Sequence, residues 1–585
     1  MTANDALVVK EEKPSTLGQW KFPLWLQGLI LFISSLLMTG YRIYYGNQAI
    51  TIPLIQSINN PSHFPNDPFV STLVHYAAPV WRLVALLANY IPIEILLTFL
   101  FLAARALVLI AAAQLAMTIN PGSKLAAVGA MAFFALWPIS LLGHGTLVSS
   151  YFEQTSLSIS FFLFAIAAFY SKRRYYWALW LAVGFTLNSM YGAYACVYFA
   201  AVFLLDKNYR SDWKNWVWSF VLFAILILPT VMLSASAFRI GTINNEIWLL
   251  ASEARFPMHL YPLTWNPPEF YVFFGFMFFS AIVLYLNKRE FSKLFKHGMI
   301  WLLASLGWIL VAFVAAYIMR SPTMLVLHPA RATDLWFAFT GISIIAIIAY
   351  LIELDTPYKN LCVILLFVSI LWQKVFDFTY LIVSMWLIIT IAVLWRPFWR
   401  FVLKEGSPTR LSNIVVLLVL SFGLFFLSRE ADSSALAHFI RIPDSQIQEI
   451  ADWAEKNTSI EDVFLIDPNW SEFRALSQRS VFTTYKDGAA ILWERSFVKD
   501  WVPRMEALGY NFYEPQAVGI STSSYLIQAL RTLYEDMDND SVIMLSSVYP
   551  LRFWVAPINH TSQFPVVFQT LEYKVLDLNP AIETK

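Results

Sequence analysis

The sequence predicts a polytopic α-helical membrane bundle of about 13 transmembrane helices, followed by a small extracytoplasmic α/β domain. The chain of 585 residues is 58% hydrophobic and only 14% charged, with a mean hydropathy of +0.58. Soluble globular domains carry about 25% charged residues. Apolar runs long enough to cross a bilayer recur as far as residue 428, whereas residues 429–585 are rich in charge and contain no such run.

Each expected transmembrane helix is an apolar run of about 20 residues, the length needed to cross a hydrocarbon core of roughly 30 Å. A charged tail, residues 1–21, precedes the first run, which is too long for the core of a cleaved signal peptide and is expected to be retained. The runs cover roughly residues 22–44, 92–118, 123–142, 155–171, 175–188, 191–205, 214–235, 269–287, 298–319, 335–353, 359–373, 378–395 and 411–428. The membrane part is therefore expected to span residues 22–428.

The positive charges indicate which side of the membrane each loop faces. A break at "NSMYG" (188–192) separates two short helices and places every strongly basic loop on one side, which the positive-inside rule makes cytoplasmic. The opposite side then receives a first loop (residues 45–91), a second loop (236–268), a third loop (320–334) and the shorter segment 143–154. It also receives the C-terminal domain, so the amino terminus is expected inside and the carboxyl terminus outside.

Composition excludes several classes of protein. Forty basic residues against 39 acidic ones give a net charge of +1, which argues against a nucleic-acid partner. The two cysteines, Cys196 and Cys362, both fall inside apolar runs, so neither a disulfide framework nor a cysteine metal site is expected.

The C-terminal domain (residues 429–585) has mixed helix and strand patterns. "DSQIQEIADWAEKN" (444–457) predicts a helix with Asp444 as its cap and one buried face, formed by Ile447, Ile450, Ala451 and Ala454. Short apolar runs at 462–468, 541–547 and 564–578 predict strands.

The first loop contains "INNPSHFPNDPFV" (58–70), a proline-rich and asparagine-rich stretch that ends at a single carboxylate. Asp67 precedes Pro68, and the residue before a proline is steered away from helical backbone. A carboxylate fixed at a membrane surface suits a general base or a metal ligand. The alternative is an Asx turn that closes the loop, an ordinary use of aspartate.

The second and third loops supply basic residues. Glu253, Arg255 and His259 lie together in "EARFPMHLYPLTW" (253–265), where arginine and histidine would suit a phosphate. The alternative is an interfacial anchor segment, in which arginine and tryptophan are common. In the third loop Arg331 is expected either to face the same cavity or to pair with Asp334.

The C-terminal domain offers weaker signals. "FRALSQRSVFTTYKDG" (473–488) places Arg474, Arg479 and Lys486 around a predicted strand. "EDMDND" (535–540) has acids at alternate positions but lacks the glycine and distal glutamate of a calcium loop, so a solvated turn is favoured. A divalent metal is compatible with such a protein, although no motif indicates one, and the cofactor is unknown.

The order of these parts resembles the GT-C class of membrane glycosyltransferases, and is closest to a group of bacterial polytopic membrane proteins of that class. The resemblance rests on "GNQAITIPLIQSINNPSHFPNDPF", "EARFPMHLYPLTW" and "WAEKNT…DVFLIDP…FRALSQRSVFTTYKD". It implies a GT-C-like fold and a polyprenyl-phosphate sugar donor. Asp67 would be the catalytic base or a metal-organising residue, and Arg255, His259 and Arg331 would hold the donor phosphate.

His63 of the first loop and Glu253 of the second loop are also expected among the substrate-binding residues. This chain departs from the class in two respects: its first loop has a single acid rather than an Asp-x-Asp pattern, and no adjacent tryptophan pair occurs anywhere. The second departure disfavours protein N-glycosylation, because the WWD signature of oligosaccharyltransferases is missing.

The sequence therefore predicts an inverting glycosyltransferase of the cell envelope. It would use a lipid-linked sugar donor and act on an extracytoplasmic acceptor. The expected partners are that donor and membrane lipids. Two alternatives stay open, a transporter or lipid-exporting permease and a catalytically inactive GT-C-shaped scaffold. Arg105 is the main charge inside the apolar runs, and the near absence of such charges argues against the transporter.

Overall fold

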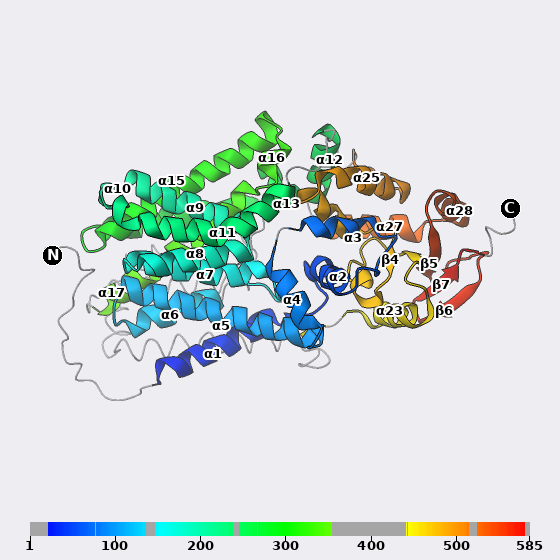
Figure 1. Cartoon of the computed structure of the whole chain (residues 1–585), viewed down its shortest axis with the longest axis horizontal. Helices are drawn as coiled ribbons and strands as arrows, with labels where there is room; N and C mark the ends of the chain where they lie inside the picture. The colour runs from blue at the N-terminus through cyan, green and yellow to red at the C-terminus, as the bar shows by residue number, and fades with distance from the viewer. Residues whose placement is uncertain are drawn as a thin grey trace, which may run out of the picture.

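A computed structural model describes residues 22–76, 78–135, 142, 147–237, 245–265, 267–353, 440–441, 443–513 and 523–579. Long helices lie side by side in a bundle at one end of the molecule, and a sheet with its own helices lies at the other (Figure 1). The mainly helical architecture and the small C-terminal sheet domain agree with the sequence analysis.

The bundle is built from the apolar runs of the first 353 residues. Its helices are α1 (Leu24–Thr39), α5 (Ile93–Ile119), α6 (Lys124–Ala135), α7 (Gln154–Tyr170), α8 (Arg174–Leu187), α9 (Ser189–Leu205), α11 (Val217–Ala237), α14 (Pro267–Leu286), α15 (Ser292–Phe313) with a π-helical turn at Val314–Ile318, and α17 (Thr333–Glu353). Each of the ten runs predicted before residue 354 contains one of these helices.

The described residues do not confirm the predicted number of membrane-spanning helices. Within the described ranges, four helices are long and apolar enough to cross a membrane, or five if the bent pair Pro68–His75 and Val80–Ala88 is one span. The four are Ile93–Ile119, Trp213–Ser234, Ser292–Ile318 and Pro322–Leu351. Other helices match predicted runs but are shorter, such as α6 with 12 residues, so the count of thirteen is not confirmed. The predicted spans 359–373, 378–395 and 411–428 lie outside the described residues.

The predicted break at residues 188–192 is confirmed. Helix α8 ends at Leu187, and the Oδ1 atom of Asn188 accepts a hydrogen bond of 3.2 Å from the Tyr191 backbone N–H, which caps α9. The other end of the same amide donates to Thr155 Oγ1 at 3.0 Å, on α7. One asparagine thus ends one helix, begins the next and ties both to a third, as expected of a strong N-cap residue.

Short helices occupy the loops between the bundle and the C-terminal domain (Figure 1). The first loop holds α2 (Gln48–Asn59), α3 (Pro68–Thr72), η1 (Leu73–His75) and α4 (Val80–Ala88). The second holds α12 (Asn245–Arg255), α13 (Pro257–Leu260) and η4 (Pro262–Thr264), and the third holds α16 (Pro322–Leu325) and η6 (Pro329–Ala332). At the opposite end of the bundle lie α10 (Lys207–Ser211) and η3 (Trp213–Trp216).

The C-terminal domain has a five-stranded sheet in the order β4-β3-β5-β7-β6. Strands β4, β3 and β5 are parallel, and β7 pairs antiparallel with both β5 and β6. Its elements are α23 (Ser445–Asn457), β3 (Val463–Leu465), α24 (Phe473–Ser477), β4 (Ser480–Val481), η7 (Tyr485–Leu492), η8 (Arg495–Phe497), α25 (Val498–Ala507), α27 (Ser523–Glu535), α28 (Asn539–Val548), β5 (Leu551–Pro557), β6 (Val566–Gln569) and β7 (Tyr573–Asp577). A separate parallel pair joins β1 (Tyr41–Arg42) to β2 (Ile440–Arg441).

Most of the predicted elements of this domain are confirmed. Asp444 caps α23 by accepting from the Gln446 N–H at 2.8 Å, and the buried face is the predicted one. The strand predicted at 541–547 is wrong, because this segment is the helix α28. Asp538 caps it by accepting from the Ser541 N–H, and Val542 and Leu545 form its buried face.

The C-terminal domain shares a hydrophobic core with the first and second loops. Trp81 of α4, Trp248 of α12 and Trp501 of α25 are almost completely buried in that one core. The Trp248 indole N–H donates to the Ile491 carbonyl at 3.0 Å, so a bundle loop and the domain also share hydrogen bonds. The domain is therefore packed into the loop end of the bundle. The predicted boundary at residues 428/429 lies outside the described ranges.

Candidate functional site

Asp67 begins helix α3 and is fully enclosed by protein donors. Its backbone is extended (φ −104°, ψ 105°), as the following Pro68 predicts. One carboxylate oxygen caps the helix by accepting from the Phe69 and Val70 N–H groups, both at 3.1 Å. The other accepts from Arg474 Nε at 2.6 Å and from the Val481 N–H at 3.0 Å. The side chain has 0% exposure, so the predicted Asx-type turn is present and is tied to the C-terminal domain.

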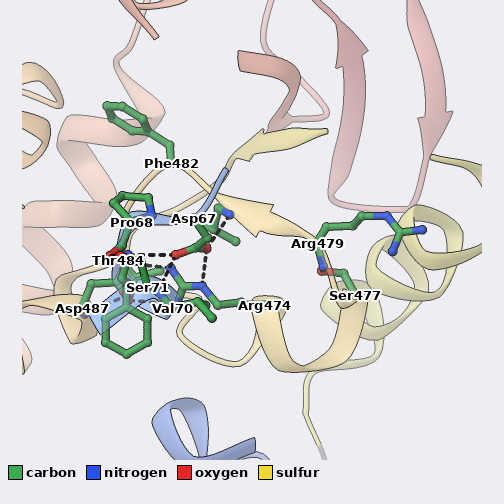
Figure 2. Close-up of polar contacts among 12 residues, drawn as sticks. Asp67, Pro68, Val70, Ser71, Arg474, Ser477, Arg479, Phe482, Thr484 and Asp487 are labelled. Carbon is green, nitrogen blue, oxygen red and sulfur yellow. Dashed lines mark hydrogen bonds and ion pairs between the residues drawn. The ribbon is translucent and has the colours of Figure 1, made fainter. Parts of the chain in front are cut away.

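Arg474 joins Asp67 to a second buried carboxylate, Asp487 (Figure 2). Its two terminal nitrogens donate to the two oxygens of Asp487 at 2.9 and 2.8 Å. Burial disfavours the charged guanidinium, but Asp487 and Asp67 more than offset this effect and raise the pKa of Arg474. We refer to Asp67, Arg474 and Asp487 as the ion triad.

Asp487 holds the first turn of η7, which carries two residues of the site. Its oxygens accept from the Thr484 N–H and the Thr484 hydroxyl, both at 2.8 Å, in a capping box. The two residues between them, Tyr485 and Lys486, are thereby directed towards the bundle. The Lys486 ammonium donates to Asn47 Oδ1 of the first loop at 2.9 Å.

Asn47 links this lysine to an acid on the bundle. Its Nδ2 atom donates to Glu153 Oε1 at 3.0 Å, while its Oδ1 atom accepts from Lys486. Glu153 precedes α7 and also accepts from Ser149 Oγ at 3.1 Å. It lines a small cavity with Arg105, Ser149 and Tyr151.

Two arginines complete what we call the basic cluster: Arg255, Arg331 and Lys486, with Glu153 as its acid. The Arg255 guanidinium carbon lies 4.7 Å from the ring centroids of both Tyr485 and Phe256. The Arg255 Nε atom is buried and has no hydrogen-bond partner among the described residues. Burial lowers the pKa of Arg255, because the charged form has lost solvent.

Arg331 reaches the cluster from the third loop. Its Nη2 atom lies 3.4 Å from Nδ1 of His259, whose ring centroid is 6.1 Å from that of His328. His328, which precedes Pro329, has φ +44°. This left-handed backbone conformation is uncommon in residues other than glycine. The Tyr194 hydroxyl donates to the His328 carbonyl at 2.8 Å and helps to hold this strained turn.

The charges of the basic cluster act on one another. Burial first, and the charges of Arg255 and Arg331 with it, lower the pKa of Lys486 to about 7, while Glu153 acts in the opposite direction. Three cationic groups in a poorly hydrated place repel each other, and Glu153 offsets part of this repulsion at Lys486 and Arg331. A bound anion would relieve this repulsion, and guanidinium groups suit phosphate oxygens.

The expected site residues therefore fall into separate groups. Arg331 contacts His259, and Arg255 and Arg331 both act on Lys486, while the phosphate-binding role that the resemblance implies for them stays a prediction. His63 has Arg479 as its charged neighbour, and burial first and this arginine second lower the pKa of His63. Glu253 interacts with Arg320 instead, and burial raises the pKa of Glu253.

Glu153 and the role of Lys486 were missed at the level of sequence. Glu153 lies in the predicted outer segment 143–154, directly before an apolar run, and an acid at that place is a signal that can be recognised. Lys486 had no comparable signal, because its neighbours are distant in sequence. In the part of the chain that the structure describes, no three His, Cys, Asp or Glu side chains are grouped so as to hold a metal ion.

This chain is similar to one sequence family and to several solved structures. A family model described as "Domain of unknown function (DUF6798)" matches residues 445–508, and no curated protein sequence matches the chain. ArnT from Cupriavidus metallidurans is similar in structure at 12% identity, over 94% of this chain and 96% of ArnT, with a TM-score of 0.42 in its apo state.

The same ArnT bound to undecaprenyl phosphate gives a TM-score of 0.43 at 12% identity, over 94% and 97% of the two chains. An Archaeoglobus fulgidus oligosaccharyltransferase tethered with an acceptor peptide gives 0.41 at 11% identity, over 91% of this chain and 69% of the other. At these values, the chemistry of this chain has to be argued from its own residues.

Proposed function

We propose that this chain is an integral-membrane glycosyltransferase-like enzyme that takes sugar from a polyprenyl-phosphate donor. The observation that carries the proposal is the basic cluster, in which Arg255 and Arg331 act on Lys486 from separate segments and Glu153 interacts with Lys486 and Arg331. The amino terminus is cytoplasmic in this proposal, and the cluster and C-terminal domain face the extracytoplasmic acceptor.

The cluster has the groups that such a transfer needs. An acceptor hydroxyl attacks the anomeric carbon of the sugar, the bond from that carbon to the phosphate oxygen breaks, and the lipid phosphate leaves with the electron pair. Cations that already face the phosphate stabilise the negative charge as it develops. A carboxylate beside them accepts the proton of the attacking hydroxyl.

Two carboxylates are candidates for that base. Glu153 lines a cavity and is only half-buried, although Asn47 donates to one of its oxygens and Ser149 to the other. Asp67, the base implied by the resemblance, has both oxygens occupied and its side chain buried. We favour Glu153 for this reason, and the assignment of Asp67 stays a prediction that substitution tests.

The test is sugar transfer by the full chain reconstituted in vesicles with a labelled polyprenyl-phosphate sugar. Glu153→Gln is expected to reduce the transfer rate by about 10²- to 10⁴-fold, the usual contribution of a positioned base. Lys486→Met is expected to reduce it by roughly 10- to 100-fold through the loss of one charged hydrogen bond. Glu246→Gln is the matched control, since this acid forms an exposed pair with Arg320 and lies outside the cluster.

Full activity of Glu153→Gln would remove this residue as the base. Absence of transfer by the wild type, together with uptake or flipping of the lipid in the same vesicles, would overturn the enzyme in favour of a transporter. Identification of a copurified polyprenyl phosphate by mass spectrometry would support the enzyme.

A further inference from the structure

The turn at residues 484–487 belongs to the C-terminal domain, yet two of its side chains build the basic cluster. The Tyr485 hydroxyl donates to the Ala254 carbonyl of α12 at 2.6 Å, and its ring lies against the Arg255 guanidinium. Lys486 donates to Asn47 of the first loop. The position of this turn therefore decides whether the lysine charge is inside the cluster.

The turn is held from behind by buried groups. Asp487 closes the capping box with Thr484, whose carbonyl accepts from the Trp501 indole N–H at 3.1 Å. Gly488 lies so close to Trp501 that an added Cβ would be 2.4 Å from the indole ring. These contacts fix the turn within its own domain, but they do not fix it relative to the bundle.

Arg474 adds a buried connection between this turn and the first loop. It spans Asp487, at the back of the turn, and Asp67 in the first loop, the loop that also supplies Asn47. The same loop is thus joined to the same turn twice, once through the ion triad and once through the Asn47–Lys486 hydrogen bond. The triad is dry: Arg474 has 1% side-chain exposure, Asp67 0% and Asp487 3%.

A buried ion group of this kind is poorly explained by stability alone. Desolvation cancels much of the attraction between buried charges, and well-packed apolar side chains would serve stability as well. Charged groups instead fix the relative orientation of the segments that carry them. A planar guanidinium with donors in fixed directions can bond to two carboxylates in only a few arrangements.

We infer that Arg474 is a positioning residue that sets the C-terminal domain against the first loop so that Lys486 completes the anion site. The domain, including the segment 445–508 that matches a family model of unknown function, then supplies part of the site. This inference rests on the proposed function for the identity of the anion. The positioning of Lys486 by Arg474 is tested separately.

The experiment measures the pKa of the Lys486 amine in the full-length protein by competitive labelling with acetic anhydride and mass spectrometry of the labelled peptides. The variants are Arg474→Met and Arg479→Met. Arg479 is the matched control, because it is a buried arginine of the same domain that bonds to Thr458 and to the carbonyl of Glu455, away from the triad (Figure 2). Sulfate, which does not titrate near neutral pH, serves as the anion probe.

In the wild type, Lys486 should titrate near 7 and sulfate should protect it from labelling. In Arg474→Met the turn is released and the amine gains solvent, so its pKa should rise by about one unit or more towards the ordinary lysine value. Sulfate protection should fall by about tenfold. Arg479→Met should keep the wild-type pKa and protection even if it lowers the melting temperature.

If Lys486 has the same pKa and the same sulfate protection in Arg474→Met as in Arg479→Met, the positioning role is overturned. If sulfate does not protect Lys486 in the wild type, the proposal of an anion site is contradicted. A change in the pKa of Lys486 that occurs only in Arg474→Met would still support the positioning role. Where Arg474→Met does not fold, Arg474→Lys replaces it. A lysine keeps the charge but not the fork of donors, so a smaller shift in the same direction is expected, and no shift would contradict the inference.

Discussion

Replacing Asp67 by asparagine separates its structural role from the catalytic role implied by the resemblance. Asparagine has the same shape and keeps an acceptor oxygen for the Phe69 and Val70 N–H groups. Its NH₂ group, however, would face two donors, Arg474 Nε and the Val481 N–H. The substitution therefore removes one side of the ion triad and leaves the helix cap in place.

The expected loss of stability follows from these contacts. Removing one partner of a buried charge pair costs about 3–5 kcal/mol, and a buried donor left unpaired costs about 1–3 kcal/mol. Arg474 keeps both hydrogen bonds to Asp487, so we expect the lower end, about 3 kcal/mol. For a cooperative unit of roughly 150–250 residues this corresponds to a fall in melting temperature of about 6–12 °C.

The assay is thermal unfolding in detergent, followed by tryptophan fluorescence, alongside the transfer assay. Asp212→Asn is the control, because Asp212 forms a half-exposed pair of 3.0 Å with Arg174. That pair should contribute no more than about 1 kcal/mol. If Asp67→Asn melts within about 2 °C of the wild type and yet loses transfer, the triad reasoning is refuted and Asp67 is the base.

Three further predictions concern other residues. Because the pKa of Lys486 is lowered to about 7, the unfolded chain holds more protons than the folded one between that pH and the ordinary lysine value. The unfolding free energy should therefore rise with pH across this window. The affinity for sulfate should fall as the pH rises through about 7, because the lysine loses its charge. The variant Lys486→Met should show neither pH effect when both quantities are measured as a function of pH. Gly488→Ala should lower the unfolding free energy by about 1–3 kcal/mol in melting experiments, since its Cβ would lie 2.4 Å from Trp501, whereas Gly307→Ala meets nothing within 4 Å and should not destabilise. Asn188→Ala should cost about 1 kcal/mol in the same melting experiments through loss of the α9 cap.

Local patterns in the sequence predict the helices well. Each apolar run in the described part of the bundle forms a helix, because a long apolar segment satisfies its backbone groups within itself. Asp444 caps its helix as predicted, and the predicted break at residues 188–192 is where Asn188 caps α9. The segment 541–547 was predicted as a strand but forms a helix. An apolar run of that length is compatible with either structure, and the cap provided by Asp538 favours the helix.

The site was harder to predict because its contacts are distant in sequence. The carboxylate of Asp67 was identified, but its partner lies 407 residues further along the chain, and no local pattern connects the two. For Arg331 the sequence left two alternatives, the cavity of Arg255 or a pair with Asp334, and in the structure it interacts with both Lys486 of the basic cluster and Asp334. Glu153 and Lys486 are linked through Asn47, a single amide whose importance depends on folded geometry.

The ion triad also has a consequence for biosynthesis. Ribosomes add about 5–20 residues each second, so the 407 residues between Asp67 and Arg474 take roughly 20–80 s to synthesise. During this interval the first loop is already made, and its carboxylate waits without its arginine. The basic cluster likewise lacks Lys486 until the C-terminal domain has emerged and docked. A partly made chain therefore cannot hold a complete site, and assembly of the two parts is the last step in acquiring one.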